Sequence, residues 1–302
     1  MFKSKNSMSR ALVRRETTAG YLFLLPSLFF FVTFVLYPMF LCIYTSFFDS
    51  NMGKNAVDVF VGLGNYKELF RDKLFLGALK NTVIIVVVAV PTVCAFSLWV
   101  ATAIYDMKPA LTSAFRCIFY LPVVTGSVAV TVVWKWMYNS RYGVFNYLFK
   151  SLGIIDQNIN WLGDARFALW CIILILFTTS VGQPIVLYVS ALGNVDHSLV
   201  EAAQVDGANR RQVFWKIKWA QIMPTTLYIL IITTINSFQC FALIQLLTSG
   251  GPTHSTDTIM YYIYYTAFKL YRYGYGNAMG VVLMIIIAVR SAVQFKLGQQ
   301  SD

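Results

Sequence analysis

Charged residues are scarce in this chain of 302 residues. They make up 12% of the chain, against about 25% in soluble proteins, and hydrophobic residues make up 58%, against about 45–50%. Length alone suggests about two soluble domains, but the chain has too little polar surface to coat a particle of that size. The composition therefore excludes a soluble enzyme, a disordered chain and a small disulfide-stapled domain. With a mean hydropathy of +0.62, it predicts an integral membrane protein.

Several chemical motifs are also missing. The five cysteines form no Cys-x-x-Cys pair, and the chain has two histidines, His197 and His254. A disulfide framework, a zinc knuckle and a histidine-based metal site are therefore disfavoured, and we expect no catalytic residue, no metal ligand and no cofactor. The phosphate-binding pattern Gly-x-x-x-x-Gly-Lys-Ser/Thr is absent as well. The chain should therefore not bind ATP through such a loop of its own.

What the chain has in abundance is long apolar runs. Stretches of about 18 residues or more are typical of membrane-spanning helices. Six such runs predict an all-α polytopic membrane protein with six spans, at residues 21–48, 82–105, 115–138, 167–192, 219–247 and 275–295. No linker, low-complexity tract or fixed-period repeat divides the chain, so residues 1–302 are expected to form one transmembrane domain.

Basic residues indicate the orientation. The first run is far longer than the core of a signal peptide, about 7–15 residues, so it is expected to remain as an anchor. Placing both termini inside puts 13 of the 24 Lys and Arg inside and 11 outside. This count is nearly a tie, but dense basic clusters precede the first span and the fifth, and cytoplasmic loops carry such clusters. We therefore expect both termini in the cytoplasm of a multi-pass protein of the cell membrane.

The net charge of +11 is consistent with a membrane protein. It lies in short loops between apolar runs, where it sets topology and contacts anionic lipid headgroups rather than nucleic acid. The outer loops, at about 49–80, 139–166 and 248–274, mix aromatic and charged residues. Within them, residues 65–70 and 145–150 are typical of short helices that lie at a membrane surface.

The predicted spans contain no Asp or Glu. An ion-coupled secondary carrier is the alternative interpretation of the chain, but such carriers normally place ionisable groups at depth, and a membrane-embedded enzyme would need clustered His, Cys or carboxylates. The polar groups at depth are uncharged. Gln183, Asn236 and Gln239 are candidates for the lining of a solute pathway, and helix–helix hydrogen bonding is the competing explanation for them.

The loop at residues 194–218 carries the most information. Ser198 can cap a short helix, with Glu201 as its capping-box partner, and Gly207 permits a sharp turn after Val205. A second amphipathic stretch then runs from Asn209 into the fifth span. These features predict a helical hairpin whose thin alanine side can enter a groove on another protein.

The same loop resembles the EAA loop of the permease subunits of binding-protein-dependent ABC importers. The match rests on six positions: Glu201, Ala202, Ala203, Asp206, Gly207 and Ala208. The similarity extends over nearly the whole chain, including Leu121-Pro122 and residues 248–252, Thr-Ser-Gly-Gly-Pro. It indicates the first-type permease of carbohydrate-uptake systems, of the maltose and glycerol-phosphate kind. One departure is Trp219-Ala220, where the family usually has Leu-Pro.

This resemblance implies a type I ABC importer permease fold and a division of labour. A second permease would complete the solute pathway, two cytoplasmic ATPase subunits would hydrolyse ATP, and an external or periplasmic binding protein would deliver a sugar or oligosaccharide. The six loop residues would couple this chain to an ATPase subunit, with Glu201 facing it. The chain itself would then be no enzyme.

Overall fold

A computed structural model describes residues 3–50 and 58–299. The regular secondary structure in these ranges is helical apart from one short antiparallel pair, β1 (Phe48–Asp49) and β2 (Val59–Phe60). Five helical segments are long and apolar enough to cross a membrane, and the number rises to six when a bent pair of helices is counted as one span. The all-α polytopic fold expected from the sequence is confirmed.

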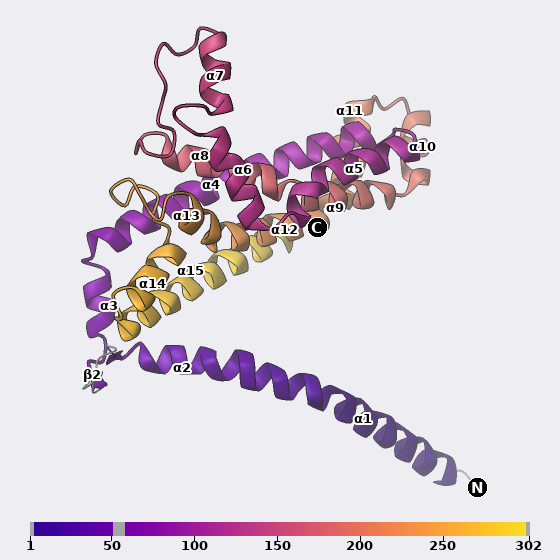
Figure 1. The fold of residues 1–302 in the computed structure, drawn as a ribbon. Helices are drawn as coiled ribbons and strands as arrows, with labels where there is room; N and C mark the ends of the chain where they lie inside the picture. Colours follow the sequence, from indigo (N-terminus) through magenta and orange to yellow (C-terminus); the bar gives the residue numbers. More distant parts are fainter. Residues whose placement is uncertain (1–2, 51–57, 300–302) are drawn as a thin grey trace.

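The body of the molecule is a bundle around α4 (Lys73–Tyr105). Helices α9 (Gly182–Gly193) and α12 (Trp219–Phe238) pack along it, and α15 (Tyr273–Gln299) packs on α12 and on α14 (Ile259–Phe268), as Figure 1 shows. Fully buried aliphatic residues of α4, α9 and α12, among them Val93, Ile185 and Ile229, form one cluster. In lipid, such contacts stabilise the bundle through close van der Waals packing.

The first span leaves this body. It runs through α1 (Lys3–Phe31), the π-helical segment η1 (Val32–Leu36) and α2 (Tyr37–Thr45), and Figure 1 shows it extending far from the other helices. The most apolar part of its 16–45 stretch has no buried residue, and Phe23 is 85% exposed. Only its outer end is attached, where Asn277 of α15 donates a hydrogen bond to Thr45. A helix that is apolar on all sides leaves lipid or a second chain to cover it.

Most of the predicted spans coincide with helices. The fourth consists of α8 (Ala168–Ser180) followed directly by α9, the fifth of α12 and α13 (Ala242–Leu247), and the sixth of α15. The second begins nine residues before the predicted boundary of 82, because Asp72 caps α4 and accepts a hydrogen bond from the amide of Leu74. The helix therefore begins before the apolar run from which it was predicted.

The third predicted span needs correction. Residues 115–138 do not form one straight helix, because α5 (Pro109–Val124) and α6 (Ser127–Met137) meet at an angle of 95°. Thr125 has extended dihedral angles at this corner. Gly126 is the N-cap residue of α6, and no side chain there binds the free amides of the first turn. The hydropathy pattern is continuous across the corner, so it did not reveal the break.

The connections between the long helices contain the two short helices that the sequence predicted, α3 (Gly64–Leu69), where β2 leads into α4, and α7 (Val144–Ser151). At the start of α4, the carboxylate of Asp72 accepts hydrogen bonds from the hydroxyls of Tyr262 and Tyr275, at 2.7 and 2.9 Å. Partial burial raises the pKa of Asp72, but these hydrogen bonds and the backbone bonds outweigh burial and leave its pKa below the usual value. One carboxylate thus ties together α4, α14 and α15.

The glycine-rich segment at 248–252 is held firmly beside this junction. The amide of Asn81 donates to the carbonyls of Ser255 and Asp257, both at 3.0 Å, and the hydroxyls of Thr248 and Thr256 are 2.8 Å apart. Asp257 is almost fully buried and accepts a 2.7 Å hydrogen bond from His254. Its burial raises the pKa above the usual value, although His254 partly offsets the effect.

Close packing of α9 on α5 generates the first prediction. A Cβ atom at Gly182 would collide with the backbone carbonyl oxygen of Phe119 in α5. Gly182→Ala should therefore destabilise the protein by about 1–3 kcal/mol, as overpacked sites do. The thermal unfolding midpoint of the purified protein measures this.

Gly77→Ala in α4 is the matched control. Nothing lies within 4 Å of the added methyl group there, and alanine is favoured over glycine within a helix, so its midpoint should equal or slightly exceed that of the parent protein. Equal midpoints for all three proteins would contradict the close contact between α5 and α9.

Candidate functional site: a helical hairpin and the helix breaks

A helical hairpin projects from one end of the long helices, where Figure 1 places α10 (His197–Val205) and α11 (Arg210–Val213). Asp196 begins it. The carboxylate of Asp196 accepts hydrogen bonds from the amide and the hydroxyl of Ser198, at 2.9 and 2.7 Å, and these bonds hold its pKa below the usual value. The predicted capping box of Ser198 and Glu201 is therefore wrong, because Asp196 takes the N-cap position and Ser198 lies inside the helix.

The turn of the hairpin depends on Gly207, as predicted. The amides of Gly207 and Ala208 donate to the carbonyls of Gln204 and Ala203, at 3.0 and 2.9 Å. This is the Schellman pattern of helix termination, and Gly207 adopts φ +82° to form it. A Cβ atom at Gly207 would meet nothing within 4 Å, so the backbone conformation, and not lack of space, requires glycine here.

Hydrogen bonds also fix the start of the return limb of the hairpin, which is α11. Asn209 and Gln212 form a reciprocal capping box, with bonds of 2.8 and 2.9 Å between each side chain and the other residue's amide. From there α11 continues through the π-helical segment η2 (Phe214–Lys218) into α12 without interruption. The hairpin is thus joined rigidly to a membrane-spanning helix.

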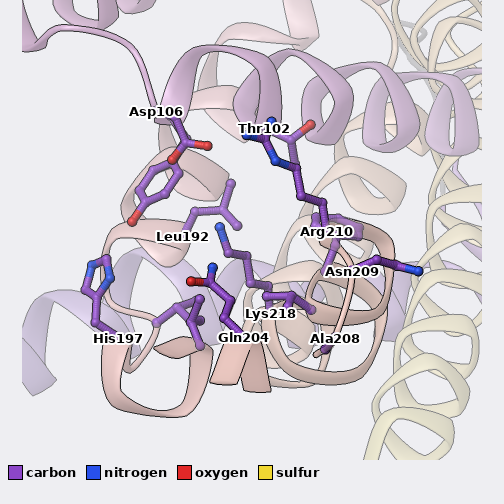
Figure 2. Close-up of a pocket in the computed structure, with 14 residues that line it drawn as sticks. Thr102, Asp106, Leu192, His197, Gln204, Ala208, Asn209, Arg210 and Lys218 are labelled. Carbon is purple, nitrogen blue, oxygen red and sulfur yellow. The ribbon is translucent and has the colours of Figure 1, made fainter. Parts of the chain in front are cut away.

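A cleft of about 780 Å³ separates the hairpin from the end of α4. Figure 2 shows His197, Gln204 and Lys218 at this cleft on the hairpin side, with Thr102 and Asp106 contributed by α4 and the turn after it. Helix α10 makes its main contacts with α11 and η2. It therefore projects over the cleft and is not packed against the bundle along its length.

The opposite side of α10 is open. Val205 is 88% exposed and Leu199 is 50% exposed. Of the six residues predicted for coupling, four are exposed, Glu201, Ala202, Asp206 and Gly207, and two are partly buried, Ala203 and Ala208. The structure brings all six together in one hairpin and presents a small, partly apolar surface with two carboxylates.

The predicted pathway residues lie at interruptions of the helices. Gln183 is the second residue of α9, directly after the junction with α8, and it faces a surface cleft of about 490 Å³ with Arg116 and Tyr120. Asn236 lies in the last turn of α12, and Gln239 is its C-cap. The side chains of Gln183, Asn236 and Gln239 are exposed and make no hydrogen bond within the described ranges. Helix–helix hydrogen bonding within the described chain therefore does not explain them.

The structure does not bring all three amides into one pocket, since Gln183 lines a cleft to which neither of the others contributes. It also reveals a third interruption of the helices, the corner at Thr125 and Gly126. The polar side chains in the sequence did not indicate this corner. Pro122 and Gly126 were the available signal, because this pair commonly interrupts helices. Broken helices in membranes leave backbone polar groups that need a wet cavity or protein contacts.

Within the described ranges, no three His, Cys, Asp or Glu residues lie close enough to hold a metal ion.

Comparison with known proteins agrees with this geometry. Residues 61–299 match the family described as the inner membrane component of binding-protein-dependent transport systems. The chain belongs to this family. It is 32% identical to the lactose transport system permease protein LacF of Rhizobium radiobacter, over 94% of this chain and 95% of LacF. It is also 32% identical to the multiple sugar-binding transport system permease protein MsmF of Streptococcus mutans, over 94% of this chain and 96% of MsmF.

Solved structures show the same fold. A chain of a bacterial alginate ABC transporter, in complex with a periplasmic protein that binds an alginate pentasaccharide, superposes with a TM-score of 0.82. The two chains are 23% identical, and the match covers 95% of this chain and 96% of the other. The permease fold expected from the resemblance is therefore confirmed.

Proposed function

We propose that this chain is a permease subunit of an ATP-driven importer for a sugar or oligosaccharide. A second permease completes the pathway, separate ATPase subunits supply the energy, and an external binding protein delivers the solute. The relatives that transport lactose and other sugars support this assignment, as does the alginate transporter with its periplasmic protein. The helices of the body contain no Asp or Glu from 73 to 105, 109 to 137, 168 to 193, 210 to 247 and 273 to 299, which disfavours an ion-coupled carrier.

The observation that carries the proposal is the place of the hairpin in the chain. It joins the end of α9 to the start of α12, and the amide of Asp196 donates to the side chain of Gln221 in α12 at 3.0 Å. Gln183 begins one of these two helices, and Asn236 and Gln239 end the other. A force on the hairpin therefore acts on both helices that carry the candidate pathway residues.

Two exposed surfaces of the chain support the proposed partners. The open side of α10 is small enough to enter a groove of an ATPase subunit, as helix-in-groove recognition requires. The second permease covers the exposed arm of residues 16–45 and the side chains at the helix breaks, because a solute pathway between two chains needs those amides at its wall. In this arrangement the chain forms one domain, lies in the cell membrane and performs no catalysis itself.

The hairpin must then lie on the cytoplasmic side, with both termini. A single reporter cysteine at Asn158, exposed in the connection after α7, should react with a membrane-impermeant thiol reagent added to intact cells. One at Asn209 should react only after the cells are opened. The parent protein, with its native cysteines, gives the background. Labelling of Asn209 in intact cells would invert the topology.

Coupling through the hairpin predicts the effect of Gly207→Val. A β-branched residue resists positive φ, so the variant should insert normally but lose sugar uptake. Glu201→Ala should reduce uptake more mildly, since it removes an exposed charge without forcing the backbone. Co-purification of the ATPase with tagged permease, and solute-stimulated ATP hydrolysis in vesicles, measure the defect.

Gly207→Asn is the matched control, because asparagine tolerates the left-handed region better than other residues. It should retain much of the uptake that Gly207→Val loses. Wild-type co-purification and hydrolysis for Gly207→Val would show that another part of the chain couples to the ATPase.

A pathway role for the amides predicts that Gln239→Leu impairs transport at unchanged membrane abundance. Leucine keeps the approximate size of the side chain but removes its hydrogen-bonding groups, so the loss should appear in uptake and not in ATPase association. Uptake of radiolabelled sugar and quantitative blotting separate the two. Normal uptake, or disappearance of the protein, would favour a packing role for Gln239.

A further inference from the structure

A strongly basic segment forms the return limb of the hairpin and its link to α12, and it contains none of the six residues assigned to coupling. Residues 210–218 contain two arginines and two lysines, and no Asp or Glu occurs between Asp206 and Asp257. Arg211 and Lys216 are exposed, and Trp215 between them is 59% exposed. We call these three residues the basic surface. Neither of its cations makes an ion pair or hydrogen bond within residues 3–50 and 58–299.

The level of this surface along the bundle follows from its neighbours. Tyr105 is the last residue of α4, and the chain re-enters the bundle at Pro109. The ammonium group of Lys218 lies 5.1 Å from the centre of the Tyr105 ring, and Trp219 packs on the cluster that contains Leu192 near the end of α9. Lys218 and Trp219 therefore lie at the level where α4 and α9 end.

Trp215 and Arg211 lie farther toward the hairpin. Trp215 lies within the π-helical segment and precedes Trp219 by about one turn, so it lies about 5 Å beyond the ends of the spans. The headgroup layer on one side of a bilayer has a thickness of about 5–7 Å. Trp215 and Lys216 thus lie at the depth of the headgroups, and Arg211, about one turn farther out, lies at the aqueous face of this layer.

The side chains suit that depth. The rings of Trp215 and Trp219 have centres 5.4 Å apart, and the ring of Phe214 lies 5.2 Å from that of Trp215. Tryptophan concentrates at membrane interfaces because its ring is apolar while its N–H can bind water or a headgroup. Trp219 and Ala220 replace the Leu-Pro of the family pattern, and the helix passes through both without a break. An aromatic pair therefore lies in the segment that carries the unpaired cations.

We propose that Arg211, Trp215 and Lys216 form a binding surface for anionic phospholipids of the inner leaflet. Arg211 and Lys216 bind the phosphate groups, and Trp215 lies among the glycerol and upper acyl groups. The side of the membrane rests on the topology of the proposed function, but the binding itself does not.

Native mass spectrometry of the importer complex in neutral-lipid nanodiscs, titrated with phosphatidylglycerol, tests this proposal. Arg211→Gln combined with Lys216→Gln should weaken phosphatidylglycerol binding, by about fivefold for each cation removed. ATPase co-purification should stay unchanged. Arg211→Lys keeps the charge and should keep the affinity. Trp215→Ala should weaken binding as well, whereas Trp215→Tyr should preserve most of it.

The matched control is Arg141→Gln combined with Lys150→Gln. These residues are exposed cations around the start and end of α7, remote from the hairpin, and their loss changes the net charge equally. Because α7 is itself typical of a helix at a membrane surface, this control should lose less affinity than the Arg211 and Lys216 double variant, and an equal loss would overturn the proposal. Unchanged phosphatidylglycerol binding in the Arg211 and Lys216 double variant would overturn the proposal. Loss of ATPase co-purification with unchanged lipid binding would also overturn it and assign the surface to the ATPase.

The test is independent of the coupling proposal. Both leaflets of the nanodisc have the same composition, so an inverted topology would leave the lipid result unchanged. A failure of hairpin coupling would appear in the Gly207→Val measurements and would not alter phosphatidylglycerol affinity.

Discussion

The pairing of backbone polar groups in lipid governs this structure. Each N–H and C=O inside a bilayer must find a partner within the protein or a wet cavity, so the apolar runs fold into helices. Where a helix stops at depth, the free groups mark a place that water, solute or another chain must reach. The corner at Thr125 and Gly126 and the end of α12 at Gln239 are such places. By contrast, the bend before Gln183 keeps helical hydrogen bonds on both sides, from Val181 to Phe177 and from Ile185 to Val181. The same constraint that builds the bundle therefore marks places that we propose as part of the wall of the solute pathway.

Mechanical continuity links these breaks to the hairpin. Residues 194–218 connect α9 to α12, with Asp196 bonded to Gln221 and η2 continuous with α12. The cleft of about 780 Å³ between the hairpin and α4 leaves α10 free of the bundle along most of its length, while both of its ends are anchored. An element held in this way transmits displacement to two helices at once. The apolar arm of residues 16–45, whose most apolar part has no buried residue, is the surface that we propose a second permease covers.

The sequence predicted the bundle because long apolar runs are stable only in lipid or in a protein core. Ile185 and Ile229, for example, are fully buried between the helices. It predicted the hairpin turn because Gly207 is one of few residues that adopt positive φ at little cost. It placed the start of α4 too late. The apolar run begins only after Lys80, whereas the hydrogen-bonded helix already begins at Lys73. It assigned the cap to Ser198, although Asp196 lies two residues earlier and its carboxylate accepts a hydrogen bond from the amide of Ser198.

Other features could not be predicted from a pattern of residue types. The 95° corner between α5 and α6 is a matter of dihedral angles within a continuous apolar run. The contact of Gly182 with α5, and the junction of Asp72 with Tyr262 and Tyr275, join residues far apart in the chain. Such contacts depend on how the helices cross, and one sequence read alone does not contain that information.

The central claim is that α10 delivers the force of ATP hydrolysis to this chain, and contact mapping tests it most directly. A photo-crosslinking amino acid at Val205, which is 88% exposed on the open side of α10, should form a covalent adduct with an ATPase subunit in cells. The same amino acid at Tyr147, which is 77% exposed on α7, a helix that Figure 1 shows apart from α10, should form none. Adducts from Tyr147 but not from Val205 would contradict the account.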